Sequence, residues 1–177
     1  MTALAAGDDR FGRPPARLTA PGLVLRPWGA PDLPTMVALF DEATVALRTP
    51  LPSPFTLATA QARLVAAEQP DRLLWAVTRD GREPLGEVLL TSSGEIGYVL
   101  GARHRGQGLA AGAVALLRDH AHTDLKRPVL RLRIEAANAQ SAAVARRAGF
   151  RLTRPAAEEV NNKGRRYALD VWEHVQA

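Results

Sequence analysis

The sequence predicts an α/β (α+β) fold in which a mixed, mostly antiparallel central sheet of six to seven strands is flanked by about four helices. Three apolar, strand-like segments, 73–78, 85–90 and 95–100, follow one another with only short turns between them, at Gly81 and Gly94. Short turns join antiparallel strands, because a parallel connection needs a long crossover. Helical and strand-like periods then alternate, so the predicted order is β-α-α-β-β-β-α-β-α-β-β.

The first part of the chain supplies one strand and two amphipathic helices. Residues 23–28 form the first predicted strand. Pro27 stops the strand, because proline removes a backbone donor. Residues 30–40 and 56–68 each place their apolar side chains on one helical face. A proline-rich break at residues 50–55 separates these two predicted helices.

The last part of the chain supplies two more helices and three strands. A helix is expected over residues 107–122, followed by a strand at 128–135 in which apolar and charged residues alternate. The next helix begins at Asn138, a residue that favours the N-cap, and ends at Gly149, which suits the left-handed position after a helix. The two final strands are expected at residues 150–154 and 166–172, with the polar segment 158–164 between them.

Length and composition indicate one domain with one site. Residues 1–21 show no hydrophobic period and are expected to form a flexible tail, and residues 22–177 are expected to form a single domain. The 177 residues include no cysteine, so thiol nucleophiles, disulfides and thiolate metal sites are excluded. His120 and His122 are two residues apart on a helix and point to different faces, so no metal site is expected there.

The charge pattern argues against nucleic acid and membranes as partners. The formal net charge is +5, but its cations are spread along the chain and no basic run is interleaved with aromatic residues. No apolar run approaches the length of a membrane span, and residues 1–11 lack the pattern of a secretory signal. We therefore expect a cytoplasmic protein that binds neither nucleic acid nor membrane, with a homodimer as the commonest assembly.

The segment of residues 96–110 is built to hold a phosphate. An apolar strand leads into a basic turn with Gly106 and Gly108, and a helix follows. The glycines allow a tight turn, and the N-terminus of a helix presents N–H groups and a positive dipole end to an anion. A nucleotide triphosphate loop would need a lysine and a hydroxyl where Leu109 and Ala110 stand, so that class is set aside.

A dinucleotide-binding protein remains a remote alternative. Residues 106–111 match the looser form of that fingerprint, and Glu135 ends the next strand as a candidate ribose ligand. However, the strands before the loop are joined as hairpins. Only about forty residues follow Glu135, too few for the remaining units of a doubly wound domain.

Two motifs together resemble one enzyme family. Residues 97–100, followed by Arg103, Gly106 and Gly108, resemble the acyl-CoA-binding motif of the GCN5-related N-acetyltransferases (GNAT). About forty residues later, Asn138, Ser141, Gly149 and Phe150 resemble the second signature of that family, and the resemblance covers roughly residues 22–173. Ser141 and the strand at 98–100 are most similar to the ribosomal-protein alanine acetyltransferase (RimJ/RimL-like) branch.

The resemblance implies a GNAT fold, with the sheet splayed at the strand before the glycine-rich loop, and an N-acetyltransferase. Acetyl would pass from acetyl-CoA to a primary amine, on a peptide or protein N-terminus or on a small molecule, by direct attack in a ternary complex and without a metal. The residues implied to contact the acyl-CoA are Tyr98, Val99, Leu100, Arg103, His104, Arg105, Gly106, Gln107, Gly108, Leu109, Ala110, Asn138, Ser141 and Arg147.

Carboxylates are sought as the general base, since the attacking amine must lose a proton. Glu95 and Glu87 are the candidates, and both stay open. Glu95 lies on the strand that would carry the acyl group, on the face opposite Tyr98. Glu158 and Glu159 are candidates for binding a cationic substrate.

The proton donor for the leaving thiolate is the weakest point of the resemblance. Many members of the family carry a tyrosine on the last helix, where this chain has Ala145. Ser141, one turn earlier, is the remaining hydroxyl on that helix and is the candidate donor. A CoA-binding module with little or no transferase activity is therefore the alternative function. The acceptor, its acyl preference and the need for a general acid stay open.

Overall fold

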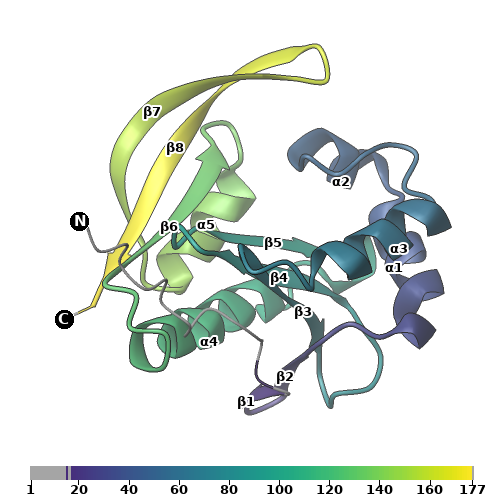
Figure 1. Ribbon diagram of the computed structural model, residues 1–177. Coiled ribbons are helices and arrows are strands. Elements are labelled where there is room, and N and C mark those ends of the chain that lie inside the picture. Colours follow the sequence, from purple (N-terminus) through teal and green to yellow (C-terminus); the bar gives the residue numbers. More distant parts are fainter. Residues whose placement is uncertain (1–14, 16, 177) are drawn as a thin grey trace, which may run out of the picture.

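Two antiparallel sheets lie side by side in the computed structural model, which describes residue 15 and residues 17–176 (Figure 1). The first sheet contains, in spatial order, β1 (Leu18–Ala20), β2 (Leu23–Arg26), β3 (Arg72–Thr78), β4 (Gly86–Thr91) and β5 (Ile96–Leu100). The second sheet contains, in spatial order, β6 (Val129–Glu135), β8 (Arg165–Val175) and β7 (Arg151–Asn162). The predicted mixed α/β class with a mainly antiparallel sheet is confirmed.

Five α-helices occur in the described part of the chain, together with two short 3-10 turns. The helices are α1 (Leu33–Phe40), α2 (Ala43–Arg48), α3 (Leu57–Ala66), α4 (Leu109–Thr123) and α5 (Ala139–Arg147). The 3-10 turns are η2 (Ala30–Asp32) and η3 (Ala102–His104). None of these helices is long and apolar enough to cross a bilayer.

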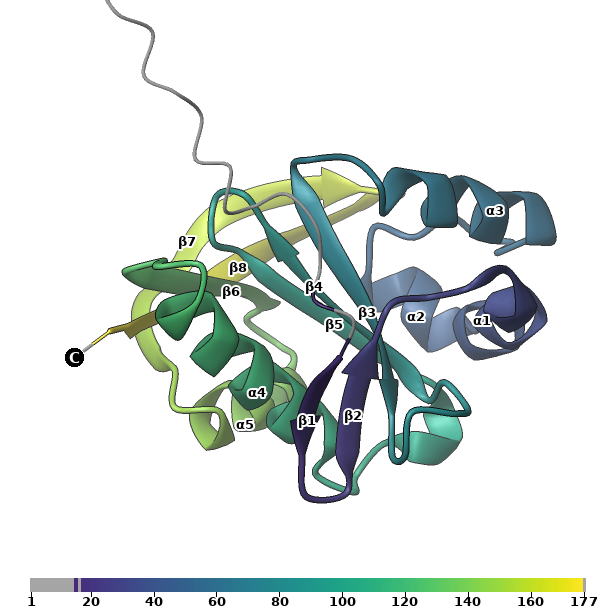
Figure 2. The ribbon, with the colours of Figure 1, turned by 60° about the horizontal axis from the view of Figure 1, so that its bottom comes forward.

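Helices cover both faces of the first sheet (Figure 2). Side chains of β3 alternate between the two faces, as a strand requires. Trp75 points to the face on which α4 packs and shares a core with Leu117, and both are fully buried. Leu74 points to the opposite face, where it packs with Phe40 at the end of α1. The sheet thus separates an α4 side from an α1 and α3 side.

The structure differs from the sequence prediction at three places. The expected tail, 1–21, lies mostly outside the described residues, but Leu18–Ala20 pairs with β2 as strand β1. Helix α2 was not predicted, because it has six residues and too short a period to be recognised. The segment 158–164, predicted to be a loop, continues β7 and turns at Lys163 and Gly164 into β8.

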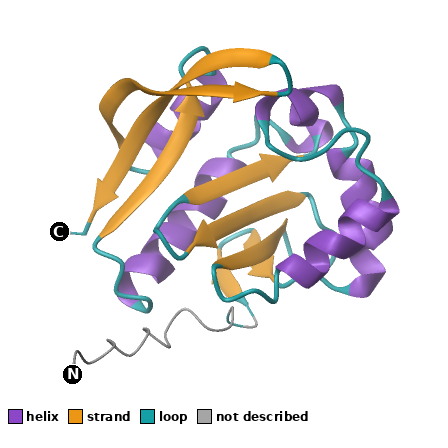
Figure 3. Ribbon diagram, turned by 45° about the horizontal axis from the view of Figure 1, so that its top comes forward, coloured by secondary structure: helices purple, strands orange, loops and turns teal. Residues whose placement is uncertain are grey.

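The hairpin of β7 and β8 extends beyond the sheet and reaches α2 (Figure 3). Both turn residues have positive φ, 51° at Lys163 and 71° at Gly164, as a tight two-residue hairpin turn requires. The Lys163 ammonium donates hydrogen bonds to the carbonyl oxygens of Ala46 at 2.7 Å, Thr49 at 3.2 Å and Leu51. The exposed strands lack the apolar alternation of a buried strand, which explains why the sequence pattern did not reveal them.

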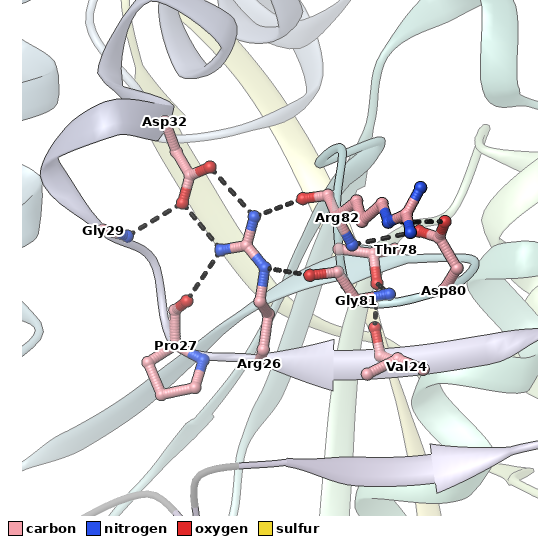
Figure 4. A network of polar contacts seen from close by, with 9 residues as sticks. All are labelled: Val24, Arg26, Pro27, Gly29, Asp32, Thr78, Asp80, Gly81 and Arg82. Carbon is pink, nitrogen blue, oxygen red and sulfur yellow. Dashed lines mark hydrogen bonds and ion pairs between the residues drawn. The ribbon is translucent and has the colours of Figure 1, made fainter.

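A carboxylate network fixes the turn between β2 and α1 (Figure 4). The guanidinium of Arg26 donates to both oxygens of Asp32, at 2.7 and 2.9 Å, and the backbone N–H of Gly29 donates to the same carboxylate at 2.9 Å. Arg26 also donates to the carbonyl oxygen of Gly81 at 2.9 Å, which ties the turn after β3 to α1. Burial alone would raise the pKa of Asp32, but the hydrogen bonds from Arg26 and Gly29 and the charge of Arg26 outweigh it and lower that pKa.

We expect Asp32→Asn to destabilise the protein by about 1–3 kcal/mol near neutral pH, because it removes a charge-assisted pair that is mostly shielded from solvent. Since the pKa of Asp32 is lowered in the folded state, its contribution is present above the unfolded pKa and is lost as the pH falls through the folded pKa. Urea unfolding of both proteins across this range checks the prediction. An equal difference in unfolding free energy at neutral and strongly acidic pH would contradict it.

Candidate active site

The two sheets separate between β5 and β6. These strands run parallel and meet at one bridge, between Glu95 and Arg131, where the N–H of Arg131 donates to the carbonyl oxygen of Gly94 at 2.9 Å. Beyond that bridge β5 pairs only with β4 among the described residues, and β6 pairs with β8. The outer edge of β5 is therefore open to pair with an extended ligand, as an added strand would.

The glycine-rich turn leads from β5 directly into α4. Gly106 and Gly108 have φ of +75° and +78°, and a Cβ at either position would meet no atom within 4 Å. Glycine is therefore required by the backbone conformation and not by crowding. Gly108 is the N-cap of α4, and its carbonyl accepts the first helical bond, from Gly112 at 3.0 Å. The N–H groups of the first turn have no partner within the helix and are available to an anion.

A cleft of about 610 Å³ opens in front of this turn. Its walls are the edge of β5, the start of α4, the start of α5 and the helix α2. The residues predicted to bind acyl-CoA that line it are Tyr98, Val99, Leu100, Arg105, Gly106, Gly108, Leu109, Ala110, Asn138, Ser141 and Arg147. Three others that were predicted, Arg103, His104 and Gln107, do not line it.

Arg105 and Gln107 hold the turn in shape. Arg105 donates to both oxygens of Glu42, at 3.1 and 2.5 Å, and to the carbonyl oxygen of Leu100 at 3.0 Å. Gln107 donates to the carbonyl oxygen of Arg103 at 3.0 Å. The guanidinium of Arg105 thus connects the glycine-rich turn to the segment between α1 and α2, which is a contact that the sequence did not predict.

Helix α5 begins and ends where its sequence predicts, and its first residues line the cleft. The side chain of Asn138 accepts a hydrogen bond from the N–H of Ser141 at 3.1 Å, so Asn138 is confirmed as the N-cap. At the other end Gly149 has φ of +86°, and Phe150 is buried and donates its N–H to the carbonyl of Ala145 at 2.9 Å. The Ser141 side chain stands at the cleft end of the helix.

The two candidate bases lie in different surroundings. Glu87 is 1% exposed and forms an ion pair with Arg63 of α3, whose Nε donates to both carboxylate oxygens at 3.1 Å. Glu87 is directly opposite Val99 in the β4–β5 register, and its bond from Arg63 places it on the α3 side of the sheet. The side chain of Glu95 is 33% exposed, at the point where β5 and β6 part.

Arg133 brings two predicted acidic residues together. Its Nε donates to Glu95 at 3.0 Å and its Nη1 donates to Glu158 at 2.8 Å. Burial would lower the pKa of Arg133, but the hydrogen bonds that it donates to Glu158 and Glu95, with their charges, outweigh burial and raise that pKa. Glu159 is not brought to this site, since it forms an ion pair with Arg166 on the other face of the hairpin.

A second network that the sequence analysis missed joins α2 to the hairpin. Glu135, at the end of β6, accepts from Arg48 of α2 at 2.8 Å and from Arg165 of β8 at 2.9 Å. Burial would raise the pKa of Glu135, and the two arginines lower it below its usual value. The alternation of charges along 128–135 was the available signal, because it places Arg133 and Glu135 on one face.

The dinucleotide-binding alternative is wrong. The three strands that precede the glycine-rich turn form antiparallel pairs, whereas that fold needs a parallel, doubly wound sheet. Glu135, its candidate ribose ligand, is instead held by two arginines. In the described part of the chain no group of three His, Asp or Glu side chains is arranged to hold a metal ion.

An antiparallel sheet that splays beside a glycine-rich turn and a helix N-terminus is the arrangement expected of the N-acetyltransferase class. Residues 22–151 match the family described as the acetyltransferase (GNAT) domain, and the chain belongs to this family. A comparison with curated proteins returns no match.

Solved structures of acetyltransferases share the fold. A probable GNAT-family acetyltransferase from Chromobacterium violaceum is 26% identical, with a TM-score of 0.78 over 99% of this chain and 94% of that one. A spermidine N-acetyltransferase from Vibrio cholerae, in complex with CoA and spermine, is 17% identical, with a TM-score of 0.76 over 88% and 96%. RimL, an acetyltransferase of ribosomal protein L7/L12 in complex with CoA, is 18% identical, with a TM-score of 0.75 over 90% and 97%.

Proposed function

We propose that this protein transfers an acetyl group from acetyl-CoA to a primary amine, by direct attack of the amine on the thioester in a ternary complex. The observation that carries the proposal is the single cleft shared by the N-terminus of α4 and the open edge of β5. The first can hold a pyrophosphate and the second an extended pantetheine arm. The CoA present in the similar spermidine acetyltransferase and RimL structures supports this donor.

The donor's pyrophosphate lies on the N–H groups of the turn at residues 106–111, and its pantetheine pairs with the edge of β5 at Tyr98 to Leu100. Arg147 is exposed at the same cleft and is suited to phosphate oxygens, because a guanidinium binds them in a bidentate manner. Arg105 acts indirectly by holding the turn through Glu42. A backbone N–H near Val99 polarises the thioester carbonyl.

Glu95 is the general base that the geometry favours. It is partly exposed where the strands part, and a carboxylate there can reach an incoming amine directly or through one water. Glu87 is less suited, because it is 1% exposed and Arg63 covers both of its carboxylate oxygens, whereas the Glu95 side chain is 33% exposed beside Arg133. We assign Glu87 the task of positioning α3 against the sheet.

Ser141 donates the proton to the leaving thiolate. It is the hydroxyl of α5 that lines the cleft, and its own backbone N–H is already satisfied by Asn138. The products are the N-acetyl amine and CoA, and the second proton of the original ammonium is released to solvent through Glu95. No acyl-enzyme forms, in agreement with the absence of cysteine from the chain.

The acceptor enters between α2 and the β7–β8 hairpin. A second cavity of about 330 Å³ lies there, lined by residues of α2, by Ser53 and by the hairpin. The similarity to RimL supports a protein N-terminus as the acceptor, and the similarity to the spermidine enzyme supports a small polyamine. We favour the protein N-terminus of a RimJ/RimL-like enzyme, because Ser141 and the strand at 98–100 point to that branch.

The decisive experiment mixes the purified protein with acetyl-CoA and a panel of N-terminal peptides and polyamines, and follows the release of free thiol. We expect turnover on at least one class of amine, with peptides preferred. A parallel series with longer acyl-CoA donors measures the acyl preference. Tight binding of CoA with no turnover on any amine would contradict the proposal and support a CoA-binding module.

A further inference from the structure

The cavity between α2 and the β7–β8 hairpin carries positive charge. Among the described residues that line it, Lys163 and Arg165 are the charged ones, and the other lining side chains are neutral. Glu158 and Glu159, which the sequence offered as ligands for a cationic acceptor, line neither cavity and are held in ion pairs by arginines of β6 and β8. The acceptor side of the proposed site is therefore cationic.

The contacts of these two cations neutralise their charge only in part. The Lys163 ammonium binds three carbonyl oxygens at the end of α2, so it meets partial negative charges and not a carboxylate. Arg165 donates to Glu135 at 2.9 Å, but the same carboxylate also binds Arg48 at 2.8 Å. One carboxylate thus serves two guanidinium groups, and positive charge is in excess along this wall.

Arg165 is held at the cavity wall by three contacts. Its Nη1 donates to the carbonyl oxygen of Leu47 at 3.0 Å, its Nη2 donates to Glu135 at 2.9 Å, and its guanidinium carbon lies 5.1 Å from the centre of the Tyr167 ring. The side chain is still 36% exposed. A guanidinium has five N–H donors, more than Leu47 and Glu135 require, so Arg165 is fixed in place and can also bind an incoming carboxylate.

Helix α2 separates this cavity from the acyl-CoA cleft. Ala46 and Leu47 line the cavity, whereas Val45 and Arg48 line the cleft. An acceptor whose amine reaches the thioester in the cleft therefore leaves the rest of its chain beside α2 and the cationic cavity. A second ammonium group is repelled there, and a carboxylate is attracted.

We propose that the acceptor is a protein N-terminus with an acidic side chain within its first few residues, and that Arg165, with Lys163 beside it, sets this preference. The proposal rests on the proposed transferase function and names the substrate class of the same site. Binding of a carboxylate by a guanidinium is charge-assisted and directional, so it also orients the acceptor. Polyamines and lysine-rich N-termini are selected against, because they bring further cations to a cavity in positive excess.

The first test uses the wild-type protein and a set of N-terminal peptides that differ at one position. Glutamate, glutamine or lysine is placed at the second, third or fourth residue, and spermidine is the polyamine probe. We expect kcat/KM for the best glutamate peptide to exceed that for its glutamine counterpart by about 5- to 20-fold, and the lysine peptide to be slower than both. High salt should reduce the difference. Equal rates for the three peptides, or a preference for lysine or spermidine, would overturn the inference.

Variants of the hairpin test the residue assignment. Arg165→Gln should abolish most of the preference for glutamate over glutamine, and Arg165→Lys, which keeps the charge, should retain most of it. Arg166→Gln is the matched control, because Arg166 is the next residue, pairs with Glu159 and lines neither cavity. Its preference should equal that of the wild type. An equal loss in Arg165→Gln and Arg165→Lys, or in Arg166→Gln, would show a structural role and overturn the assignment.

A binding measurement separates this inference from the proposed function. N-acetylated forms of the same peptides are titrated into the protein saturated with CoA, and calorimetry gives their affinities without any turnover. We expect the acetylated glutamate peptide to bind more tightly than the acetylated lysine peptide. That order in a protein that acetylates no amine would overturn only the transferase function. Turnover without a charge preference would overturn only this inference.

Discussion

Gly108→Val is expected to weaken the binding of CoA by about 10- to 100-fold, or more where the turn rearranges. Gly108 has φ of +78°, a conformation in which a β-branched residue is strained, and it is the N-cap from which the N–H groups of α4 face the cleft. Relief of the strain turns those N–H groups away from the phosphates. Isothermal titration calorimetry with CoA measures the effect.

Gly22→Val is the matched control. Gly22 has φ of +68° in the turn between β1 and β2, and a Cβ there would meet no atom within 4 Å, which is also true at Gly108. Both substitutions should therefore lower the melting temperature by similar amounts, but Gly22→Val should leave the affinity for CoA intact. An equal loss of CoA affinity in both variants would show that general destabilisation, and not the turn, is responsible.

Glu95→Gln is expected to lower kcat by about 100- to 10,000-fold, the range for loss of a general base, while the affinity for CoA stays unchanged. The amide keeps the size of the side chain and can still accept a bond from Arg133, so the site should keep its shape. Steady-state kinetics and calorimetry with CoA provide the two measurements.

Glu173→Gln is the control for this second prediction. Glu173 accepts from Arg131 at 2.8 Å, an ion pair of the same kind that lies at the closed end, before the strands part. We expect its turnover to match that of the wild type. If Glu95→Gln retains its turnover and Glu87→Gln loses it in a folded protein, the general base is Glu87.

Local chemistry explains which parts of the site were predictable. Gly106, Gly108 and Gly149 occupy left-handed backbone positions, and Asn138 caps a helix, so each needs its residue type whatever surrounds it. Such requirements depend only on a few neighbouring residues in the chain. They were enough to predict the glycine-rich turn, the span of α5 and, by resemblance, the family.

The ionic contacts among β6, α2 and the β7–β8 hairpin could not be predicted in the same way. Arg133 joins Glu95 and Glu158, which lie 38 and 25 positions away in the chain, and Glu135 joins α2 to β8. Many arginines and acids are available to a chain of this composition, and only the register of β6 against β8 and the reach of the hairpin select these pairs. The sequence analysis offered Glu87 as a candidate base for the same reason. It could not show that Arg63, on the distant helix α3, forms hydrogen bonds with the Glu87 carboxylate.

The sequence by itself determined the fold class, the glycine-rich turn with the helix behind it, and the capped helix that closes the cleft, because these depend on periods and backbone conformations encoded within a few residues. Only the tertiary structure decided that the bridge between Glu95 and Arg131 is where β5 and β6 part, that Arg133 joins Glu95 to Glu158, and that Glu135 joins α2 to β8. Those arrangements depend on how distant strands and helices pack, which no local pattern specifies.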